Sequence, residues 1–132
     1  MAQRRILIAD DESYVTQILN LNLQRRGYAV FVAGDGGTAY DLALAHVPDL
    51  VISDCQMPIL DGLALCMRLK STAKTAHVPV LLLTARGHTI EPDDLARTNI
   101  RAVVPKPFSM RELFPKIERA LLVAPAEERK VG

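Results

Sequence analysis

Five short apolar runs recur along the chain, and segments with helical spacing separate them. The runs cover residues 6–9, 29–33, 50–53, 78–83 and 102–104. Each run is continuous rather than alternating, and its length suits a strand that is buried on both faces. The pattern therefore predicts five strands in a sheet with helices on both sides.

Helical spacing is clearest in the segment before Gly27, the residue expected to end that helix. Its apolar stripe consists of Val15, Ile18, Leu19 and Leu23. Asp61 and Ser109 are expected to cap the third and the last helix. The predicted ranges of the four longer helices are 12–26, 37–46, 62–73 and 110–123.

The remaining helix, the fourth along the chain, is expected to be short. Glu91, Asp93 and Asp94 form an acidic first turn, and Pro92 stands near its start. Only about six residues follow before Ile100 resumes an extended pattern.

Strands that alternate with helices favour parallel pairing with right-handed crossovers. We therefore expect a three-layer α/β sandwich with a five-stranded parallel sheet and five helices. The chain of 132 residues is long enough for one domain, which we place at residues 1–123. Residues 124–132 have the proline and charge content of a flexible tail.

Composition narrows the possible partners. Sixteen Lys and Arg against fifteen Asp and Glu leave a net charge of +1, which predicts no general attraction to nucleic acid or to a membrane. The apolar runs are too short to cross a bilayer, and residues 1–5 do not open a signal peptide. We expect a cytoplasmic protein whose two cysteines, Cys55 and Cys66, are reduced.

Chemically active side chains follow the predicted strands. In an open parallel sheet, ligands bind at the carboxyl ends of the strands. The residues at these positions are Asp10, Asp11, Glu12, Asp54, Thr84 and Lys106. Clustered carboxylates repel one another unless a cation lies between them, and an all-oxygen set suits Mg²⁺ better than Zn²⁺.

Each of these residues has an ordinary structural interpretation when taken alone. Asp10 or Asp11 could cap a helix, Asp54 could lie in a turn, Thr84 could end a strand, and Lys106 could be a surface ammonium. Their common position at one edge of the predicted sheet favours a shared site over these separate roles.

These motifs resemble response-regulator receiver domains of two-component signalling, over roughly residues 4–122. The resemblance rests on four blocks: the run 6–9 with the acids after it, Leu50 to Asp54 with Met57, Pro58, Asp61 and Gly62, Thr84 with Ala85, and Lys106 with Pro107 and Phe108. It implies a flavodoxin-like, CheY-like fold with strand order 2-1-3-4-5.

The resemblance also implies the role of each residue at the site. Asp54 would be the phosphoacceptor, and Thr84 and Lys106 would contact the phosphoryl oxygens. Asp10, Asp11, Asp54 and the backbone carbonyl of Gln56 would hold Mg²⁺, or alternatively Mn²⁺. The peptide bond between Lys106 and Pro107 would be cis.

Three positions are expected to tune the response. Gln56 and Arg86 occupy positions whose side chains admit or block the attacking water in this family, with solvent-exposed variation as the equal alternative. Val103 stands where the family commonly has Tyr or Phe, so the usual aromatic reporter of the conserved hydroxyl is absent. Phosphorylation would then be coupled to the output surface through the backbone of the fourth helix instead.

The implied function is a stand-alone signalling switch. Asp54 would take a phosphoryl group from a histidine kinase or a histidine phosphotransfer protein, change the surface of the fourth helix, fifth strand and fifth helix, and control a partner protein or relay phosphate. The protein would catalyse its own phosphorylation and dephosphorylation without being a turnover enzyme. It would be a monomer or a phosphorylation-dependent homodimer.

Three other classes compete with this interpretation. A degenerate receiver would be an interaction module that is never phosphorylated. A flavodoxin-like cofactor binder would need a hydroxyl- and glycine-rich loop where this chain has acids. A haloacid-dehalogenase-type phosphatase would need a second Asp at position 56, which is Gln56.

Overall fold

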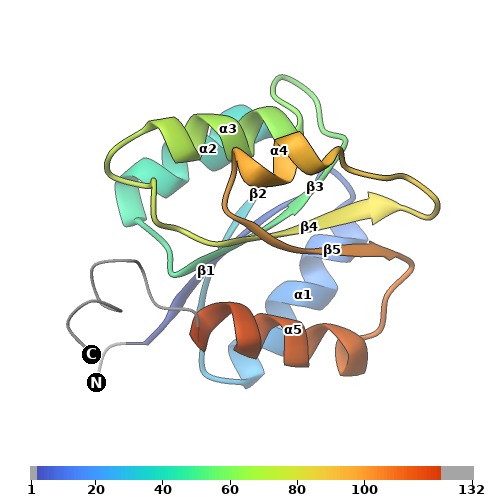
Figure 1. The fold of residues 1–132 in the computed structure, drawn as a ribbon. Coiled ribbons are helices and arrows are strands. Elements are labelled where there is room, and N and C mark those ends of the chain that lie inside the picture. Colours follow the sequence, from blue (N-terminus) through green and yellow to red (C-terminus); the bar gives the residue numbers. More distant parts are fainter. Residues whose placement is uncertain (1–2, 123–132) are drawn as a thin grey trace.

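The computed structural model describes residues 3–122, and the predicted tail lies outside this range. Strands and helices alternate along the chain (Figure 1). The strands are β1 (Arg5–Ala9), β2 (Ala29–Ala33), β3 (Leu50–Asp54), β4 (Val80–Ala85) and β5 (Ile100–Lys106). The helices are α1 (Ser13–Arg25), α2 (Gly36–His46), α3 (Gly62–Ser71), α4 (Pro92–Ala96) and α5 (Met110–Leu122).

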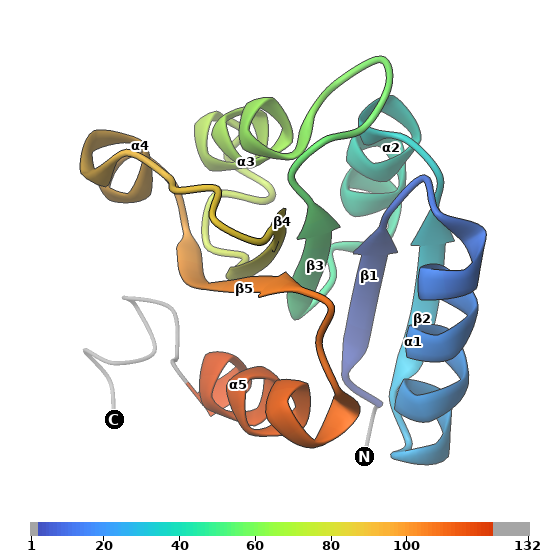
Figure 2. The same cartoon turned by 90° about the vertical axis from the view of Figure 1, so that its right-hand side faces the viewer.

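The five strands form one parallel sheet in the order β2-β1-β3-β4-β5. Helices α1 and α5 cover one face, and α2, α3 and α4 lie on the other (Figure 2). This arrangement confirms the predicted three-layer sandwich and its strand order. It also brings the carboxyl ends of the central strands to one edge of the sheet.

Two apolar cores lie on opposite faces of the sheet, because successive strand residues point to opposite sides. Ile6 and Ile8 of β1 pack with residues of α1 and α5, whereas Leu7 packs with residues of α2 and α3. Val15, Leu19 and Leu23 of the predicted stripe are buried in the first core, whereas Ile18 is exposed. Both sheet faces are thus covered, which explains why the strands read as continuous apolar runs.

Both predicted caps are present. Asp61 Oδ1 accepts a hydrogen bond of 2.8 Å from the backbone N–H of Ala64. Ser109 Oγ accepts from the N–H of Glu112, while the Glu112 carboxylate accepts from the N–H of Ser109, which forms a reciprocal capping box. Gly27 follows α1 with φ of +93°, a conformation that favours glycine.

Strand β4 is shifted by two residues from the apolar run that predicted it, and β5 extends beyond its run at both ends. Val78 belongs to a turn, since its N–H donates to the carbonyl of Thr75, and β4 begins two residues later. At its other end β4 continues through Thr84, which pairs with Pro105 of β5. Strand β5 is at the sheet edge, where half-exposed positions and a proline are tolerated.

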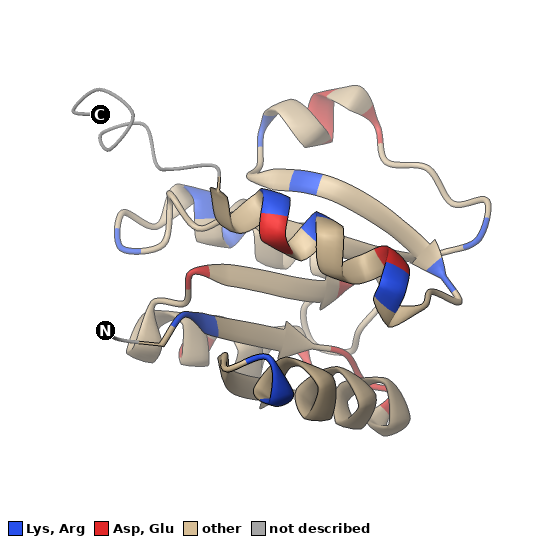
Figure 3. Ribbon diagram, turned by 90° about the horizontal axis from the view of Figure 1, so that it is seen from below, with Lys and Arg blue, Asp and Glu red and all other residues tan. Residues whose placement is uncertain are grey.

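Charge is mixed over the molecule. In the view of Figure 3, Lys and Arg residues are interspersed with Asp and Glu residues along the helices, in keeping with the net charge of +1.

Among residues 3–122, no helix combines the length and the apolar character that crossing a membrane requires.

Candidate functional site

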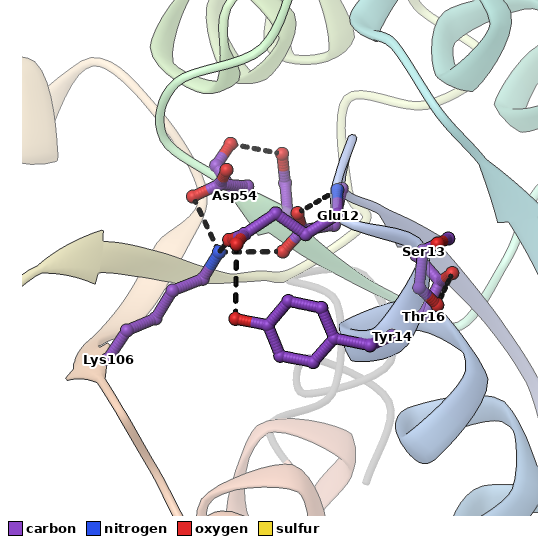
Figure 4. A network of polar contacts seen from close by, with 8 residues as sticks. Glu12, Ser13, Tyr14, Thr16, Asp54 and Lys106 are labelled. Atoms are coloured by element: carbon purple, nitrogen blue, oxygen red, sulfur yellow. Dashed lines mark hydrogen bonds and ion pairs between the residues drawn. The ribbon is translucent and has the colours of Figure 1, made fainter.

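Three strand ends bring the predicted acids and the lysine together. Ala9 of β1 pairs with Ser53 of β3, so the residues after them, Asp10 and Asp54, lie side by side at the edge of the sheet. Lys106 is the last residue of β5, and its side chain extends toward Asp54 (Figure 4). The expected convergence at one sheet edge is therefore present for these three side chains.

The Lys106 ammonium contacts three carboxylates. Its Nζ lies 2.9 Å from Asp10 Oδ2, 2.8 Å from Glu12 Oε1 and 3.4 Å from Asp54 Oδ1. An ammonium has three N–H donors and no acceptor, so these contacts can occupy all of them.

Asp10 is held rigidly at the bottom of the site. Its side chain has no solvent exposure, and each oxygen accepts a hydrogen bond: Oδ2 from Lys106 and Oδ1 from the backbone N–H of Glu12 at 2.9 Å. A buried carboxylate needs such partners to remain charged. The geometry therefore fixes the direction of Asp10.

Glu12 joins this group from the start of α1. It is the N-cap residue of the helix, but its side chain makes no cap hydrogen bond. One carboxylate oxygen accepts from Lys106 instead, and the other accepts from the Tyr14 hydroxyl at 3.1 Å. These hydrogen bonds, first that of Lys106 and then that of Tyr14, lower the pKa of Glu12.

Asp54 has a different electrostatic environment. Burial raises the pKa of its carboxyl, the charge of Asp10 raises it further, and Lys106 opposes both effects. Burial also lowers the pKa of Lys106, but the hydrogen bonds to Glu12 and Asp10 outweigh this and leave it above its ordinary value. Asp54 is thus the carboxylate whose negative charge is least compensated by hydrogen bonds.

Asp54 faces a polar hollow of about 480 Å³. The residues that line it are Asp11, Glu12, Asp54, Gln56, Met57, Pro58, Ala85 and Lys106. Gln56 and Asp11 are exposed at its rim. The hollow leaves room for a small anionic group against Asp54 and Lys106.

The donor set fits a hard divalent cation. Carboxylate oxygens of Asp10, Glu12 and Asp54 all lie within 4.8 Å of one another. Oxygen ligands suit Mg²⁺, Ca²⁺ or Mn²⁺, and a cation there would relieve the repulsion that raises the pKa of Asp54.

Glu12 was not among the predicted ligands, whereas Asp11 was. Asp11 lines the hollow with an exposed side chain but is not in the close group of three, and its role as a ligand stays a prediction. A signal for Glu12 was available, because it is one of the three consecutive acids that follow the first strand.

The other predicted positions surround the site in different ways. Thr84 is buried in β4 but does not line the hollow at Asp54. Arg86 is exposed and lines a neighbouring hollow of similar size. Val103 is half-buried and packs against the core beneath α2 and α3. The peptide bond between Lys106 and Pro107 is cis, the isomer that the resemblance implied.

The loop after Asp54 passes very close to α3. The N–H of Gly62 donates to the carbonyl of Cys55 at 2.8 Å. A Cβ atom at position 62 would overlap the backbone carbonyl of Asp54. Glycine is therefore required for this close approach, which fixes the backbone at the candidate acceptor.

Comparison with known proteins gives a consistent result. Residues 6–118 match the family described as the response regulator receiver domain. Response regulator MprA of Mycolicibacterium vanbaalenii is 41% identical over 118 residues, which are 89% of this chain and 50% of the relative. The DNA-binding dual master transcriptional regulator RpaA of Synechocystis sp. is 36% identical, with 89% and 48% covered. The chain thus spans about half the length of the curated relatives it matches.

Solved structures have the same fold. A putative response regulator from Chloroflexus aurantiacus has a TM-score of 0.83 at 31% identity, with 91% of this chain and 98% of that chain covered. The receiver domain of sensor histidine kinase PA1611 from Pseudomonas aeruginosa has a TM-score of 0.80 at 25% identity, with the same coverage. That structure is described as having a magnesium ion coordinated in the active site cleft.

Proposed function

This chain belongs to the response regulator receiver domain family, and we propose that it accepts a phosphoryl group on the carboxylate of Asp54. The single observation that carries the proposal is the contact of the Lys106 ammonium with both Asp10 and Asp54 at the edge of a hollow. A cation fixed beside an acceptor carboxylate is what transfer of an anionic group requires.

The contacts favour Asp54 over its neighbours as the acceptor. Both oxygens of Asp10 and both oxygens of Glu12 accept hydrogen bonds of 3.1 Å or less. The contact of Asp54 with Lys106 is longer, at 3.4 Å, and Asp54 faces the hollow. An oxygen of Asp54 is thus the most available nucleophile in the group.

The proposed donor is a phosphohistidine on a histidine kinase or a histidine phosphotransfer protein. An oxygen of Asp54 attacks phosphorus in line, the new P–O bond forms, and the P–N bond to the imidazole breaks. The electron pair of that bond returns to the imidazole nitrogen. Lys106 stabilises the charge on the equatorial oxygens of the phosphoryl group.

We propose that Mg²⁺, or Mn²⁺ in its place, binds beside Asp54. Asp10 and Asp54 would hold it, with Glu12 or Asp11 and the backbone carbonyl of Gln56 as further oxygen ligands. Bound there, the cation supplies positive charge that offsets the repulsion between carboxylates and phosphoryl oxygens. The magnesium ion in the related Pseudomonas aeruginosa receiver supports this choice.

The proposed output is a change of conformation. The product carries about −1.5 to −2 charge units where Asp54 carried one, and it adds strong acceptor oxygens. We propose that Thr84 moves toward these oxygens and that the surface of α4, β5 and α5 changes as a result. Val103 cannot make the rotamer change of an aromatic side chain, so the conformational change would pass through α4.

The same site would release phosphate to water, which makes the protein a timed switch rather than a turnover enzyme. Control of a partner protein or onward relay of phosphate is the proposed role, in the cytoplasm. A receiver that only binds partners is the alternative, and the contacts between Asp10, Asp54 and Lys106 argue against it.

The test is incubation with acetyl phosphate and Mg²⁺, followed by intact mass measurement. We expect the wild-type protein to gain the mass of one phosphoryl group and Asp54→Asn to gain none. Asp41→Asn is a matched control, because Asp41 is an exposed acid on α2. Equal labelling of wild type and Asp54→Asn, or no labelling of either, would overturn the proposal.

A further inference from the structure

The side chain of Glu12 is fixed at both of its oxygens. Lys106 donates to Oε1 at 2.8 Å, and the Tyr14 hydroxyl donates to Oε2 at 3.1 Å. Figure 4 shows the tyrosine ring beneath Glu12, with its hydroxyl pointing to the same carboxylate that Lys106 contacts. Tyr14 thus supports the Glu12–Lys106 contact through its hydrogen bond to Glu12.

Lys106 must give up one of its three carboxylates to contact a phosphoryl oxygen. Its N–H donors number three, and three carboxylates lie within 3.4 Å. The side chain of Glu12 is 42% exposed, against 0% for Asp10 and 11% for Asp54. Asp54 itself carries the phosphoryl group, so Asp10 and Glu12 are the carboxylates that compete with that group for Lys106. Because water can replace a lost partner at Glu12 but not at the buried Asp10, Glu12 is the one that Lys106 releases at the lowest cost.

We propose that Tyr14 is a positioning residue that holds Glu12 on Lys106 in the unphosphorylated protein and so limits how readily Lys106 contacts a phosphoryl group. The inference rests on the proposed function of Asp54 and adds a regulatory contact to the same site. Removing the Tyr14 hydroxyl leaves Glu12 less well held, and the equilibrium shifts toward the state in which Lys106 contacts phosphoryl oxygens.

The competing explanation is that Tyr14 is a surface residue of α1 without influence on the site. Its side chain is 61% exposed, so water can replace its hydroxyl. A hydrogen bond to a charged group contributes more than a neutral one, but solvent exposure reduces this contribution. We therefore expect loss of the Tyr14 hydroxyl to change the affinity for a mimic of the phosphoryl group by about fivefold. The two explanations differ in whether the effect depends on Glu12.

The experiment compares wild type, Tyr14→Phe, Glu12→Gln and the double variant. Each is titrated with beryllofluoride, a mimic of the phosphoryl group, at saturating Mg²⁺ in a calorimeter. Tyr14→Phe keeps the ring and loses only the hydroxyl. Tyr40→Phe is the matched control, because it also loses a tyrosine hydrogen bond, the 2.8 Å contact with Thr72, away from the site.

We expect Tyr14→Phe to bind beryllofluoride about fivefold more tightly than wild type, and Tyr40→Phe to bind like wild type. In the Glu12→Gln background the change of Tyr14 should have little further effect, because the two residues act through one contact. Unchanged or weaker binding by Tyr14→Phe would overturn the inference. So would an equal gain in the Glu12→Gln background.

The outcomes also separate this inference from the proposed function. If wild type binds beryllofluoride and Asp54→Asn does not, the function of Asp54 stands whatever Tyr14→Phe does. If wild type does not bind it, the proposed function fails and the role of Tyr14 fails with it.

Discussion

Lys106 and Asp10 are 96 residues apart in the sequence, yet a hydrogen bond of 2.9 Å joins Nζ of the lysine to Oδ2 of the aspartate. The contact links the end of β5 to the residue that follows β1, at the carboxyl edge of the sheet. Asp10 is inaccessible to solvent, so in the protein without metal Lys106 neutralises its charge. The site is therefore also part of what stabilises the fold.

Replacing the lysine should destabilise the metal-free protein. Lys106→Met leaves Asp10 as a buried charge without its cation, and we expect the free energy of unfolding to fall by about 3 kcal/mol. Urea unfolding measures this, and added Mg²⁺ should restore part of the loss. Lys74→Met is the control, since Lys74 is exposed. Equal stability of Lys106→Met and wild type would contradict the account.

Replacing Asp54 should have the opposite effect at neutral pH. Burial, and then the charge of Asp10, raises the pKa of Asp54 above its ordinary value of 3.8, so the ionised form lowers the free energy of unfolding. Asp54→Asn should be more stable than wild type at pH values at which the carboxyl of wild-type Asp54 is ionised. This advantage should shrink as the pH falls toward 3.8 and wild-type Asp54 takes up a proton.

Urea unfolding in the presence of a chelator, between about pH 4 and pH 8, tests this pH dependence. Excess Mg²⁺ should reverse the order of the two proteins at neutral pH, because the ion stabilises the ionised carboxylates of the folded state. A wild-type protein that is more stable than Asp54→Asn at neutral pH without metal would refute the prediction.

The close approach of α3 to Asp54 predicts a sensitive glycine. A methyl group at position 62 would overlap the Asp54 carbonyl, and Gly62→Ala should lose about 2 kcal/mol of stability. Gly34→Ala is a matched control, since a Cβ atom there meets nothing within 4 Å. Thermal unfolding of both variants is the measurement, and equal midpoints would show that the loop adjusts freely.

The two cysteines should differ in reactivity. Burial raises the pKa of both thiols, that of Cys66 to about 12. Cys66 is buried, whereas Cys55 is half-exposed and lines a hollow together with Gln56 and Met57. Reactive thiolate is therefore scarcer and less accessible at Cys66. Iodoacetamide treatment of the native protein, followed by peptide mass analysis, should label Cys55 first. Prior labelling of Cys66 would mean that the α3 face of the core opens.

Much of the fold follows from local patterns in the sequence. The stripe containing Leu19 and Leu23 predicted α1, and Asp61 and Ser109 predicted the starts of α3 and α5. These features depend on neighbours within one or two turns, so the sequence alone reveals them. The strand order came from the resemblance, because pairing between distant strands leaves no local signal.

Features set by tertiary contacts were harder to predict. Strand β5 is longer than its apolar run because pairing with β4, not burial, defines its ends. The Glu12 side chain contacts Lys106 instead of capping α1, because β5 places Lys106 within hydrogen-bond distance of it.

The central claim is that Asp54 carries the phosphoryl group, and the position of the label tests it most directly. The protein is phosphorylated with acetyl phosphate, the acyl phosphate is reduced with borohydride, and peptide sequencing by mass spectrometry locates the resulting homoserine. The account predicts homoserine at position 54, formed only when Mg²⁺ or Mn²⁺ is present. Homoserine at position 10 or 11, 5-hydroxynorvaline at position 12, or labelling that is independent of a divalent cation, would contradict it.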